Sequence, residues 1–314
     1  MSRAVVATAF GGPEVLSVVE QPDVPPGPGE AVLEVRAAGI NPADWKAYRG
    51  DMGRDASRLP LRLGYEVAGV VTAVGEGATG PSGPVSVGDE VIGFRVQGGY
   101  ADRLVVPASA LVPKPAALDW PAAAGLMLAG ATAVHALTAT GVGEGDTVLV
   151  HGAAGGVGLA LVQLARARGA RVIGTAGGDS ADLVTRLGGE PVRYGPGLAD
   201  RVRALAPDGV DAAVDAVGTD EAVDVSLELV VDRGRIASIA AFSRADTGIR
   251  LLGNGPGADP GTEVRDAARL ELVRLVADGR FEVVVAGTHP LDDVAAAHRE
   301  GMAGHTHGKL VLLP

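Results

Sequence analysis

A glycine-rich turn is the part of this sequence whose residue types and spacing are most informative about chemistry. The run from Val148 to Ala176 reads VLVHGAAGGVGLALVQLARARGARVIGTA, and Ala153, Gly155 and Gly158 follow the spacing A-x-G-x-x-G within it. Such glycines let the chain turn tightly, let backbone N–H groups approach a diphosphate and let a helix pack closely on the preceding strand. The first glycine of the usual motif is replaced by alanine, so the flanking residues must decide between a nucleotide site and an ordinary turn.

The flanking residues place this turn between a strand and a helix. An apolar strand-like run, Val148 to Val150, precedes the turn, and apolar residues then recur at helical spacing until Arg168 and Gly169. A basic residue followed by glycine is typical of a helix end. We therefore interpret the turn as dinucleotide-binding. The residues expected to hold the diphosphate are Gly152, Ala153, Ala154, Gly155, Gly156, Val157 and Gly158.

The choice between NADPH and NADH depends on the loop that follows the next strand. NAD-binding units place a carboxylate there to bind the ribose hydroxyls, whereas this chain has Thr175-Ala176-Gly177. That pattern favours NADPH, but Asp179 would repel a 2′-phosphate and no Arg or Lys lies in residues 174–185, so NADH stays open. The residues expected at the adenosine end are Thr175, Ala176, Gly177, Ser180 and Tyr194, the last with a sheet-edge role as an equal alternative.

The elements that must position this turn alternate between strand and helix. Apolar runs at 148–150, 172–175, 210–217 and 236–240 are separated by helical patterns, which predicts an α/β fold with a doubly wound parallel sheet of the Rossmann type. We expect a helix over 263–278 and, in Val283 to Val285, the last strand of that sheet. Residues 1 to about 120 instead show short β-like runs bounded by Gly, Pro or Asp, an all-β pattern.

Composition limits the possible partners. A chain of 314 residues exceeds the roughly 250 to 300 at which single cores stop growing, so we expect two domains. The net charge of −11 argues against a nucleic-acid or anionic-membrane surface, and the absence of cysteine excludes disulfides and cysteine-ligated zinc. The start has no signal-peptide pattern, and the apolar segment 122–134 is shorter than the ~20 residues of a membrane span. We interpret 122–134 as a buried helix and expect a cytoplasmic protein with a small-molecule partner.

Several segments in order along nearly the whole chain carry a family resemblance. They read GGPEVL, AAGINPADWKAYRG, GYEVAGVVTAVGEG, VGDEVIGF, GGYADRLVVPASALVPKP, LAGATAVHAL, the glycine turn and GHTHGKLVLLP. Together they resemble the zinc-independent quinone oxidoreductase (zeta-crystallin-like) branch of the medium-chain dehydrogenase/reductase superfamily. The resemblance implies a GroES-like β-barrel domain (1–122 and 285–314), a Rossmann domain (123–284), a nicotinamide site in the cleft and a homodimer.

The same resemblance indicates whether the chain is expected to bind zinc. The zinc-dependent branch has a Cys and a His as ligands in motifs similar to GINPAD and GYE, and this chain has Asn41 and Tyr65 there. We therefore expect no zinc. His305 and His307 stand beside glycines, which is more typical of a solvated loop than of a metal site.

The resemblance also suggests four catalytic candidates. Asn41 can donate its amide to a substrate carbonyl, or it can cap the turn that follows it. Lys46 occupies a place where related enzymes often carry Tyr, and it either serves as proton source or ribose contact or is simply solvated. Tyr48 is a possible substitute for that Tyr, and Tyr65 is expected to line the substrate side.

Four further residues are expected at the cofactor. Thr132 matches the family's nicotinamide-contacting Thr, with helix packing as the alternative, and Lys309 is a candidate for the adenosine phosphate. Ala241 and Phe242 follow a strand of the parallel sheet and therefore lie at its ligand-binding edge.

The resulting hypothesis is a metal-free, NADPH-dependent reductase of quinones or α,β-unsaturated carbonyl compounds. The alternative is an NADPH-binding structural or sensor protein with little turnover.

Overall fold

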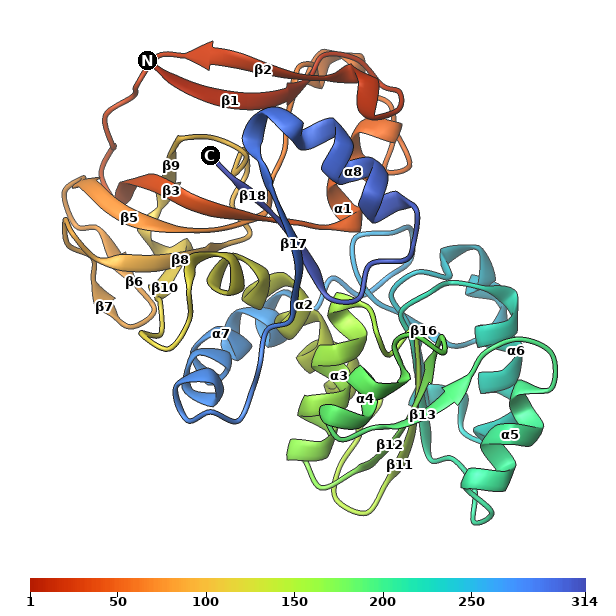
Figure 1. Cartoon of the computed structure of the whole chain (residues 1–314). Coiled ribbons are helices and arrows are strands. Elements are labelled where there is room, and N and C mark those ends of the chain that lie inside the picture. The colour runs from red at the N-terminus through yellow and green to blue at the C-terminus, as the bar shows by residue number, and fades with distance from the viewer. The chain divides into compact units, whose positions relative to one another are not determined.

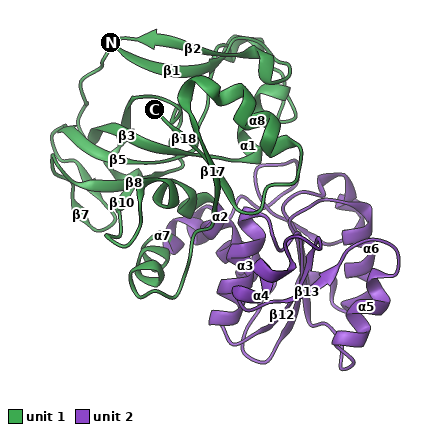
Figure 2. Cartoon of the chain, viewed as in Figure 1, with its two compact units in different colours: residues 1–128, 269–314 green, residues 129–268 purple.

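The computed structural model describes all 314 residues and divides the chain into two compact units (Figure 2). Unit 1 comprises residues 1–128 and 269–314, and unit 2 comprises residues 129–268. These boundaries differ from the expected ones at 122/123 and 284/285. The reason is that helices α2 (Trp120–Ala139) and α7 (Thr262–Ala277) each run across a boundary, so the chain changes unit inside a helix rather than in a loop.

Unit 2 is built on a six-stranded sheet in which every pair is parallel. Its order is β13 (Glu190–Arg193), β12 (Arg171–Ala176), β11 (Thr147–His151), β14 (Ala212–Asp215), β15 (Ile236–Ser238) and β16 (Arg250–Leu251). The helices between them are α3 (Gly156–Ala167), α4 (Ala181–Arg186), α5 (Leu198–Leu205) and α6 (Asp220–Leu229) (Figure 1). Chain order 3-2-1-4-5-6 is the doubly wound Rossmann arrangement, and it confirms the predicted α/β fold.

The strands of this sheet are buried on both faces. Leu149, Ile173, Ala213 and Ile236 come from four neighbouring strands and are at most 1% exposed. A parallel sheet covered by helices needs such continuous apolar runs, which is why the runs were recognisable in the sequence.

Unit 1 contains the β-rich fold expected from the amino-terminal residues. Its main sheet has the order β10 (Leu111–Pro113), β8 (Glu90–Phe94), β5 (Glu66–Val74), β3 (Glu30–Ile40), β18 (Lys309–Leu313) and β17 (Val285–Pro290), and β9 (Arg103–Pro107) also pairs with β3. A smaller sheet has the order β2 (Leu16–Gln21), β1 (Ser2–Ala7) and β4 (Leu61–Arg62). Helices α1 (Pro42–Arg49) and α8 (Val294–Met302) and the hairpin β6 (Thr79–Gly80) and β7 (Gly83–Pro84) complete it.

Six short 3₁₀ helices lie in the connections. They are Pro13–Val15, Ala56–Arg58, Ala108–Ala110, Arg233–Arg235, Phe242–Thr247 and Leu291–Asp293.

One strand prediction is wrong. We expected Val283 to Val285 to complete the parallel sheet of unit 2, but the strand that begins at Val285 is β17, which pairs with β18 in unit 1. The physical reason is that a three-residue apolar run shows neither its sheet nor its partner. The parallel sheet ends instead at the two-residue strand β16, which is too short to give a sequence pattern.

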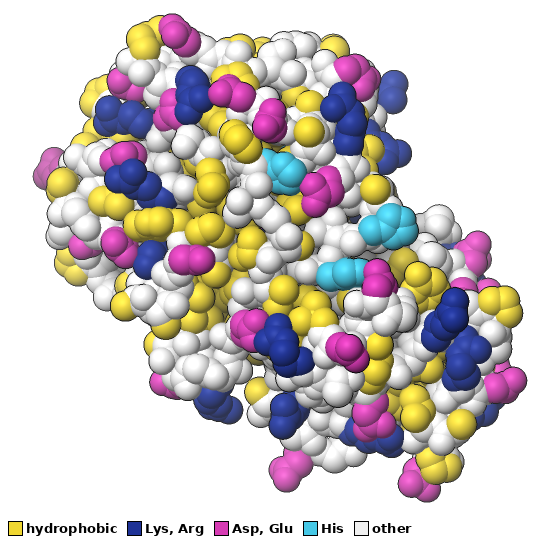
Figure 3. All heavy atoms as spheres, in the orientation of Figure 1, with side chains coloured by type: hydrophobic (Ala, Val, Ile, Leu, Met, Phe, Trp, Pro, Cys, Tyr) yellow, Lys and Arg dark blue, Asp and Glu magenta, His cyan; other side chains and the backbone are white.

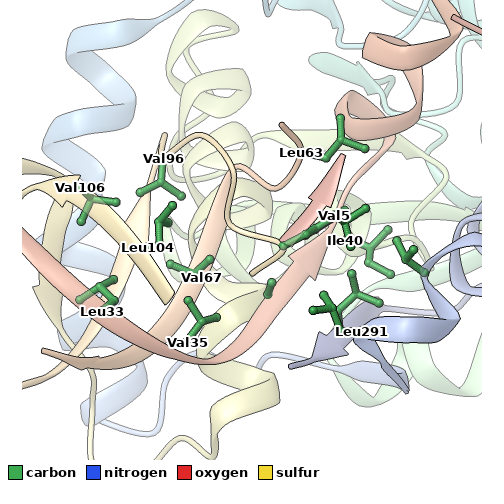
Figure 4. Packing of buried hydrophobic residues seen from close by; sticks show 14 of the residues in the cluster. Val5, Leu33, Val35, Ile40, Leu63, Val67, Val96, Leu104, Val106 and Leu291 are labelled. Carbon is green, nitrogen blue, oxygen red and sulfur yellow. The ribbon is translucent and has the colours of Figure 1, made fainter. Parts of the chain in front are cut away.

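The core of unit 1 lies between its sheets and α8. Figure 4 shows Val5 of β1, Leu33 of β3, Val67 of β5 and Leu104 of β9 together with Leu291, which precedes α8. Alternate residues of these strands point inward, so one face of each strand forms the core.

Helix α2 is longer than the expected 122–134. It has 20 residues and is apolar enough to cross a membrane by length and composition alone, but 78% of its most apolar window is buried inside the fold. That burial agrees with the interpretation of a core helix.

On the face shown in Figure 3, acidic and basic side chains are interspersed.

Candidate functional site

The glycine turn lies at the carboxyl end of β11, as expected. Gly152 has φ +73°, a conformation that favours glycine, and its N–H donates to Thr175 Oγ1 at 2.9 Å. The N–H of Ala153 donates to the Thr175 carbonyl at 3.0 Å. An added Cβ at Gly158 would lie 2.0 Å from the Gly152 carbonyl oxygen. Strand β12 and the first turn of α3 therefore fix the shape of this turn.

The turn fits a diphosphate. An added Cβ at Gly155, the N-cap of α3, would meet only the Gly152 oxygen, at 3.5 Å, so backbone can approach a ligand there. No side chain caps the first N–H groups of α3. Uncapped N–H groups at a helix start favour an anion, and β11 and β14 are the strands between which the sheet changes direction, where such folds bind ligands.

Two loops beside the turn are fixed by a buried carboxylate that the sequence did not reveal. Asp215, at the end of β14, accepts hydrogen bonds from the N–H groups of Val217 and Gly218, both at 2.8 Å, and from the Ser238 hydroxyl at 2.6 Å. Ser238 Oγ in turn accepts from the Ala240 and Ala241 N–H groups. The predicted cofactor residue Ala241 thus lies in a loop whose backbone is anchored to Asp215.

The residues predicted for the adenosine end lie after β12 and β13. An added Cβ at Gly177 would lie 2.8 Å from Asp179 Oδ1 and 3.8 Å from the hydroxyl oxygens of Ser180 and Tyr194, so the structure brings these four residues together. Tyr194 is 59% exposed, whereas Ser180 is buried and donates to the Gly177 carbonyl. Ala176 is also buried, and Thr175 acts on the glycine turn rather than facing solvent.

The remaining cofactor predictions concern Thr132 and Phe242. Thr132 is buried within α2, and Phe242 is half-buried, with its ring 2.5 Å from the position of an added Cβ at Gly255. Contacts of either residue with a cofactor stay predictions.

In unit 1, Asn41 starts α1 and lies in a buried cluster. Its Nδ2 donates to Glu66 Oε1 at 2.9 Å and to the Gly39 carbonyl at 3.3 Å, and its Oδ1 accepts from Lys309 Nζ. Both amide hydrogens are therefore used by the protein. This contradicts the expectation that Asn41 donates to a substrate carbonyl, and supports the turn-capping alternative, because Asn41 N–H also donates to Asp44 Oδ2 at 2.8 Å.

The predicted phosphate contact of Lys309 is contradicted as well. Its side chain is 6% exposed, and its ammonium donates to the Ile40 carbonyl at 3.1 Å, to Glu66 Oε1 at 2.8 Å and to Asn41 Oδ1. An ammonium has three N–H donors, so none remains for a phosphate. Sequence reasoning missed this because a lysine at the start of a strand near the chain end gives no sign of burial.

Tyr48 is buried too, which contradicts its predicted role as proton donor to the substrate. Its hydroxyl lies 3.0 Å from His298 Nδ1, and His298 Nε2 lies 3.3 Å from the Tyr100 hydroxyl. Tyr100 hydrogen-bonds the Asp44 carboxyl, and Asp44 also accepts the Gly64 N–H at 2.9 Å. Burial raises the pKa of Asp44 to about 7, raises the pKa of Tyr48 well above its usual value, and lowers the pKa of His298 to about 4. This network joins α1, α8 and the segment before β5.

The low pKa of His298 predicts a pH dependence of stability. The folded protein holds His298 neutral down to about pH 4, whereas unfolded chains protonate histidine near pH 6.5, so this group makes the unfolding free energy rise between those values. His298→Gln removes that contribution. We expect the stability difference between wild type and variant to grow by on the order of 3 kcal/mol from pH 4 to pH 6.5.

Urea unfolding at pH 4.5, 6.5 and 8 measures this difference. Tyr48 and Tyr100 contact His298 in the wild type, Asp44 hydrogen-bonds Tyr100, and all three are present in both proteins, so their own titration largely cancels. A difference that is the same at pH 4.5 and 6.5 contradicts the assignment.

Lys46 and Tyr65 are the two catalytic candidates that keep partial exposure. Burial lowers the pKa of the Lys46 ammonium, and burial raises the pKa of the Tyr65 phenol. Lys46 lies on α1, whose N-cap is Asn41, and Tyr65 directly precedes β5.

No group of three or more His, Asp or Glu side chains is arranged to hold a metal ion. The places that correspond to zinc ligands do not fit zinc, because the Asn41 oxygen already accepts from a lysine ammonium, whose charge would repel a metal ion.

Comparisons with known proteins agree with this architecture. Residues 27–116 match the model of the alcohol dehydrogenase GroES-like domain, and residues 187–312 match that of the zinc-binding dehydrogenase domain. The quinone oxidoreductase of Pseudomonas aeruginosa is 34% identical over 334 residues, which cover 100% of both chains. The chain belongs to the quinone oxidoreductase family.

Two solved structures of similar proteins carry NADPH. A mycobacterial protein complexed with NADPH is 34% identical, with a TM-score of 0.87 over 99% of this chain and 100% of its own. The Escherichia coli quinone oxidoreductase complexed with NADPH is 29% identical, with a TM-score of 0.86 over 100% of both chains. The chain thus has the fold of medium-chain quinone oxidoreductases, as the sequence motifs predicted.

Proposed function

We propose that this protein is an NADPH-dependent oxidoreductase that reduces quinones or α,β-unsaturated carbonyl compounds without a metal ion. The observation that carries the proposal is the glycine turn after β11, whose shape and uncapped N–H groups fit a diphosphate. Similarity along the whole chain to quinone oxidoreductases, and to structures that hold NADPH, supports the choice of cofactor and acceptor.

In the proposed reaction, the chain's own residues bind the cofactor, orient its nicotinamide half and protonate the substrate. When bound, a reduced nicotinamide supplies the hydride. Reduction of a quinone to a hydroquinone needs one hydride and one proton, and Lys46 is the proton source we favour, because its lowered pKa makes the ammonium a better acid than an exposed lysine. The loop at Ala241, anchored through Ser238 to Asp215, orients the nicotinamide half. Orientation alone supplies on the order of 7 to 11 kcal/mol in well-aligned reactions.

An assay of NADPH oxidation with 1,4-benzoquinone or 9,10-phenanthrenequinone tests the proposal. We expect oxidation that depends on both acceptor and protein, and no effect of a metal chelator. Tight NADPH binding with no acceptor-dependent oxidation would instead support the structural or sensor protein. The homodimer and the cytoplasmic location stay predictions.

Asp179 sets the preference between the two reduced cofactors. Its carboxylate lies beside Gly177, where a 2′-phosphate is expected, so Asp179→Ser removes a repulsion that NADH does not experience. We expect the NADPH dissociation constant to fall about threefold to tenfold, at most about 1.4 kcal/mol, with that of NADH nearly unchanged. Fluorescence titration with both cofactors measures this.

The matched control is Asp208→Ser, an exposed aspartate in the loop between α5 and β14. It should leave both dissociation constants unchanged. The gain in Asp179→Ser should shrink at high salt, because an exposed charge is screened. Equal changes for NADPH and NADH would show that Asp179 does not act on the 2′-phosphate.

A further inference from the structure

A buried ion pair in unit 1 has no part in the cofactor site described above. Glu66 has no exposed surface and Lys309 only 6%, and their charged groups lie 2.8 Å apart. The pair is fully hydrogen-bonded. Lys309 Nζ donates to three oxygens, while the Glu66 carboxylate accepts from Lys309, from Asn41 Nδ2 and from the Leu128 N–H at 2.8 Å.

The pair and its partners come from five separate elements. Ile40 ends β3, Asn41 is the N-cap of α1, Glu66 starts β5, Leu128 lies in α2 and Lys309 starts β18. Figure 1 shows β18 beside β3, where the strands are paired antiparallel. One lysine and one glutamate therefore fix the relative positions of the end of β3, the starts of β5 and β18, the start of α1 and the body of α2.

The two catalytic candidates that keep partial exposure, Lys46 and Tyr65, lie on or directly before an element that the ion pair contacts. Tyr65 is the chain neighbour of Glu66, and it keeps partial exposure whereas Glu66 is fully buried. Lys46 lies on α1, whose N-cap is Asn41. The pair thus contacts the backbones that carry Lys46 and Tyr65.

At two positions beside the ion pair, glycine leaves space that a larger side chain would fill. An added Cβ at Gly39 would lie 2.5 Å from Glu66 Oε1, and one at Gly125 would lie 3.2 Å from Lys309 Cβ. Replacing a buried ion pair by apolar residues of similar size is often neutral or stabilising, so stability alone does not explain such a site.

We propose that Glu66 and Lys309 are positioning residues for the reaction, and that their pairing holds Lys46 and Tyr65 in the arrangement that proton transfer to the substrate requires. The inference rests on the proposed function. Neither residue is expected to touch substrate or cofactor. Their effect reaches kcat through the backbones of β5 and α1.

The test compares single and double variants of the pair. Lys309→Met leaves a buried carboxylate uncompensated, so we expect a marked fall in melting temperature. Lys309→Met combined with Glu66→Gln is neutral and should melt close to wild type. We expect kcat of this double variant with 1,4-benzoquinone to be lower by about tenfold or more, and the NADPH dissociation constant to change less than about threefold, because small misplacements of reacting groups are costly.

The matched control is the ion pair of Lys114 and Glu90, at 3.0 Å, whose lysine side chain is also 6% exposed. Lys114→Met with Glu90→Gln should leave kcat unchanged. If the double variant at 309 and 66 does not fold, Glu66→Gln alone is measured, and it should lower kcat with NADPH binding retained.

Three results would overturn the inference. Wild-type kcat in the folded double variant, or in Glu66→Gln when the double variant does not fold, would show that the pair is only structural. An equal loss in the control pair would show that any charge removal slows the enzyme. If the wild-type protein binds NADPH but no quinone supports NADPH oxidation, the proposed function fails and the inference fails with it. The wild-type rate distinguishes that case from the other two.

Discussion

Gly158→Ala is expected to abolish measurable NADPH binding at micromolar protein and to lower stability. The new Cβ would lie 2.0 Å from the Gly152 carbonyl oxygen and 2.7 Å from the Ala153 backbone, so α3 must move away from the turn. Overpacking of this kind costs about 1 to 3 kcal/mol, and more when the neighbour is backbone. A shift of the uncapped helix start also removes the N–H groups from the diphosphate, for which we expect a loss of roughly 100-fold, about 3 kcal/mol.

Isothermal titration with NADPH and thermal unfolding measure the two effects. Gly143→Ala is the matched control, because an added Cβ there meets nothing within 4 Å. It should leave binding and melting temperature near wild type. NADPH affinity in Gly158→Ala within threefold of wild type would show that the diphosphate is held elsewhere, and would contradict the site.

The fold was predictable where the pattern of the sequence is local. The helix at 263–278 repeats with the helical period, and the four apolar runs of the parallel sheet are continuous because both faces of that sheet are buried. The glycine turn was identified by its spacing between one such run and a helix. β16 could not be predicted, because two residues carry no period. The assignment of Val283 to Val285 failed because a short apolar run does not identify its partner strand.

The position of the candidate site was predictable only where it is formed by backbone groups rather than by side chains. The glycines of the turn have the spacing expected of a diphosphate-binding turn, and the structure places them between β11 and α3. Side-chain roles depend on burial and on distant partners, which spacing does not show. Asn41, Tyr48 and Lys309 were chosen as groups that face ligands, and each is committed to partners far away in the chain.

Some of the missed residues left a signal and others did not. Asn41 and Asp44 are three residues apart and form a capping box, which the sequence Asn-Pro-Ala-Asp already suggests. His298 lies in a helix with no companion motif, and its contact with Tyr48 spans 250 residues. Asp215 ends an apolar run, and an acidic residue at the end of a buried strand beside a glycine turn is the signal that could have identified it.

Asp215→Ala is expected to have the second large effect, on both stability and cofactor binding. Three donors point at this buried carboxylate, and the variant leaves the Val217 and Gly218 N–H groups and the Ser238 hydroxyl without their acceptor. Unpaired buried donors cost about 1 to 3 kcal/mol each, so we expect the unfolding free energy to fall by about 3 kcal/mol or more. Since Ser238 holds the Ala241 backbone, NADPH binding should also weaken, by roughly tenfold.

The control lies at the opposite end of the same strand, directly before β14. Asp211 is exposed and accepts only the Thr147 N–H, at 2.8 Å, so Asp211→Ala should cost little stability and leave NADPH binding unchanged. Urea unfolding and titration with NADPH compare the two variants. A second titration with ADP-ribose, which lacks the nicotinamide ring, separates the two halves of the site. Because the Asp215 loops are expected to orient the nicotinamide half, ADP-ribose should bind Asp215→Ala nearly as well as wild type, and an equal loss for both ligands would place the effect of Asp215 on the glycine turn instead.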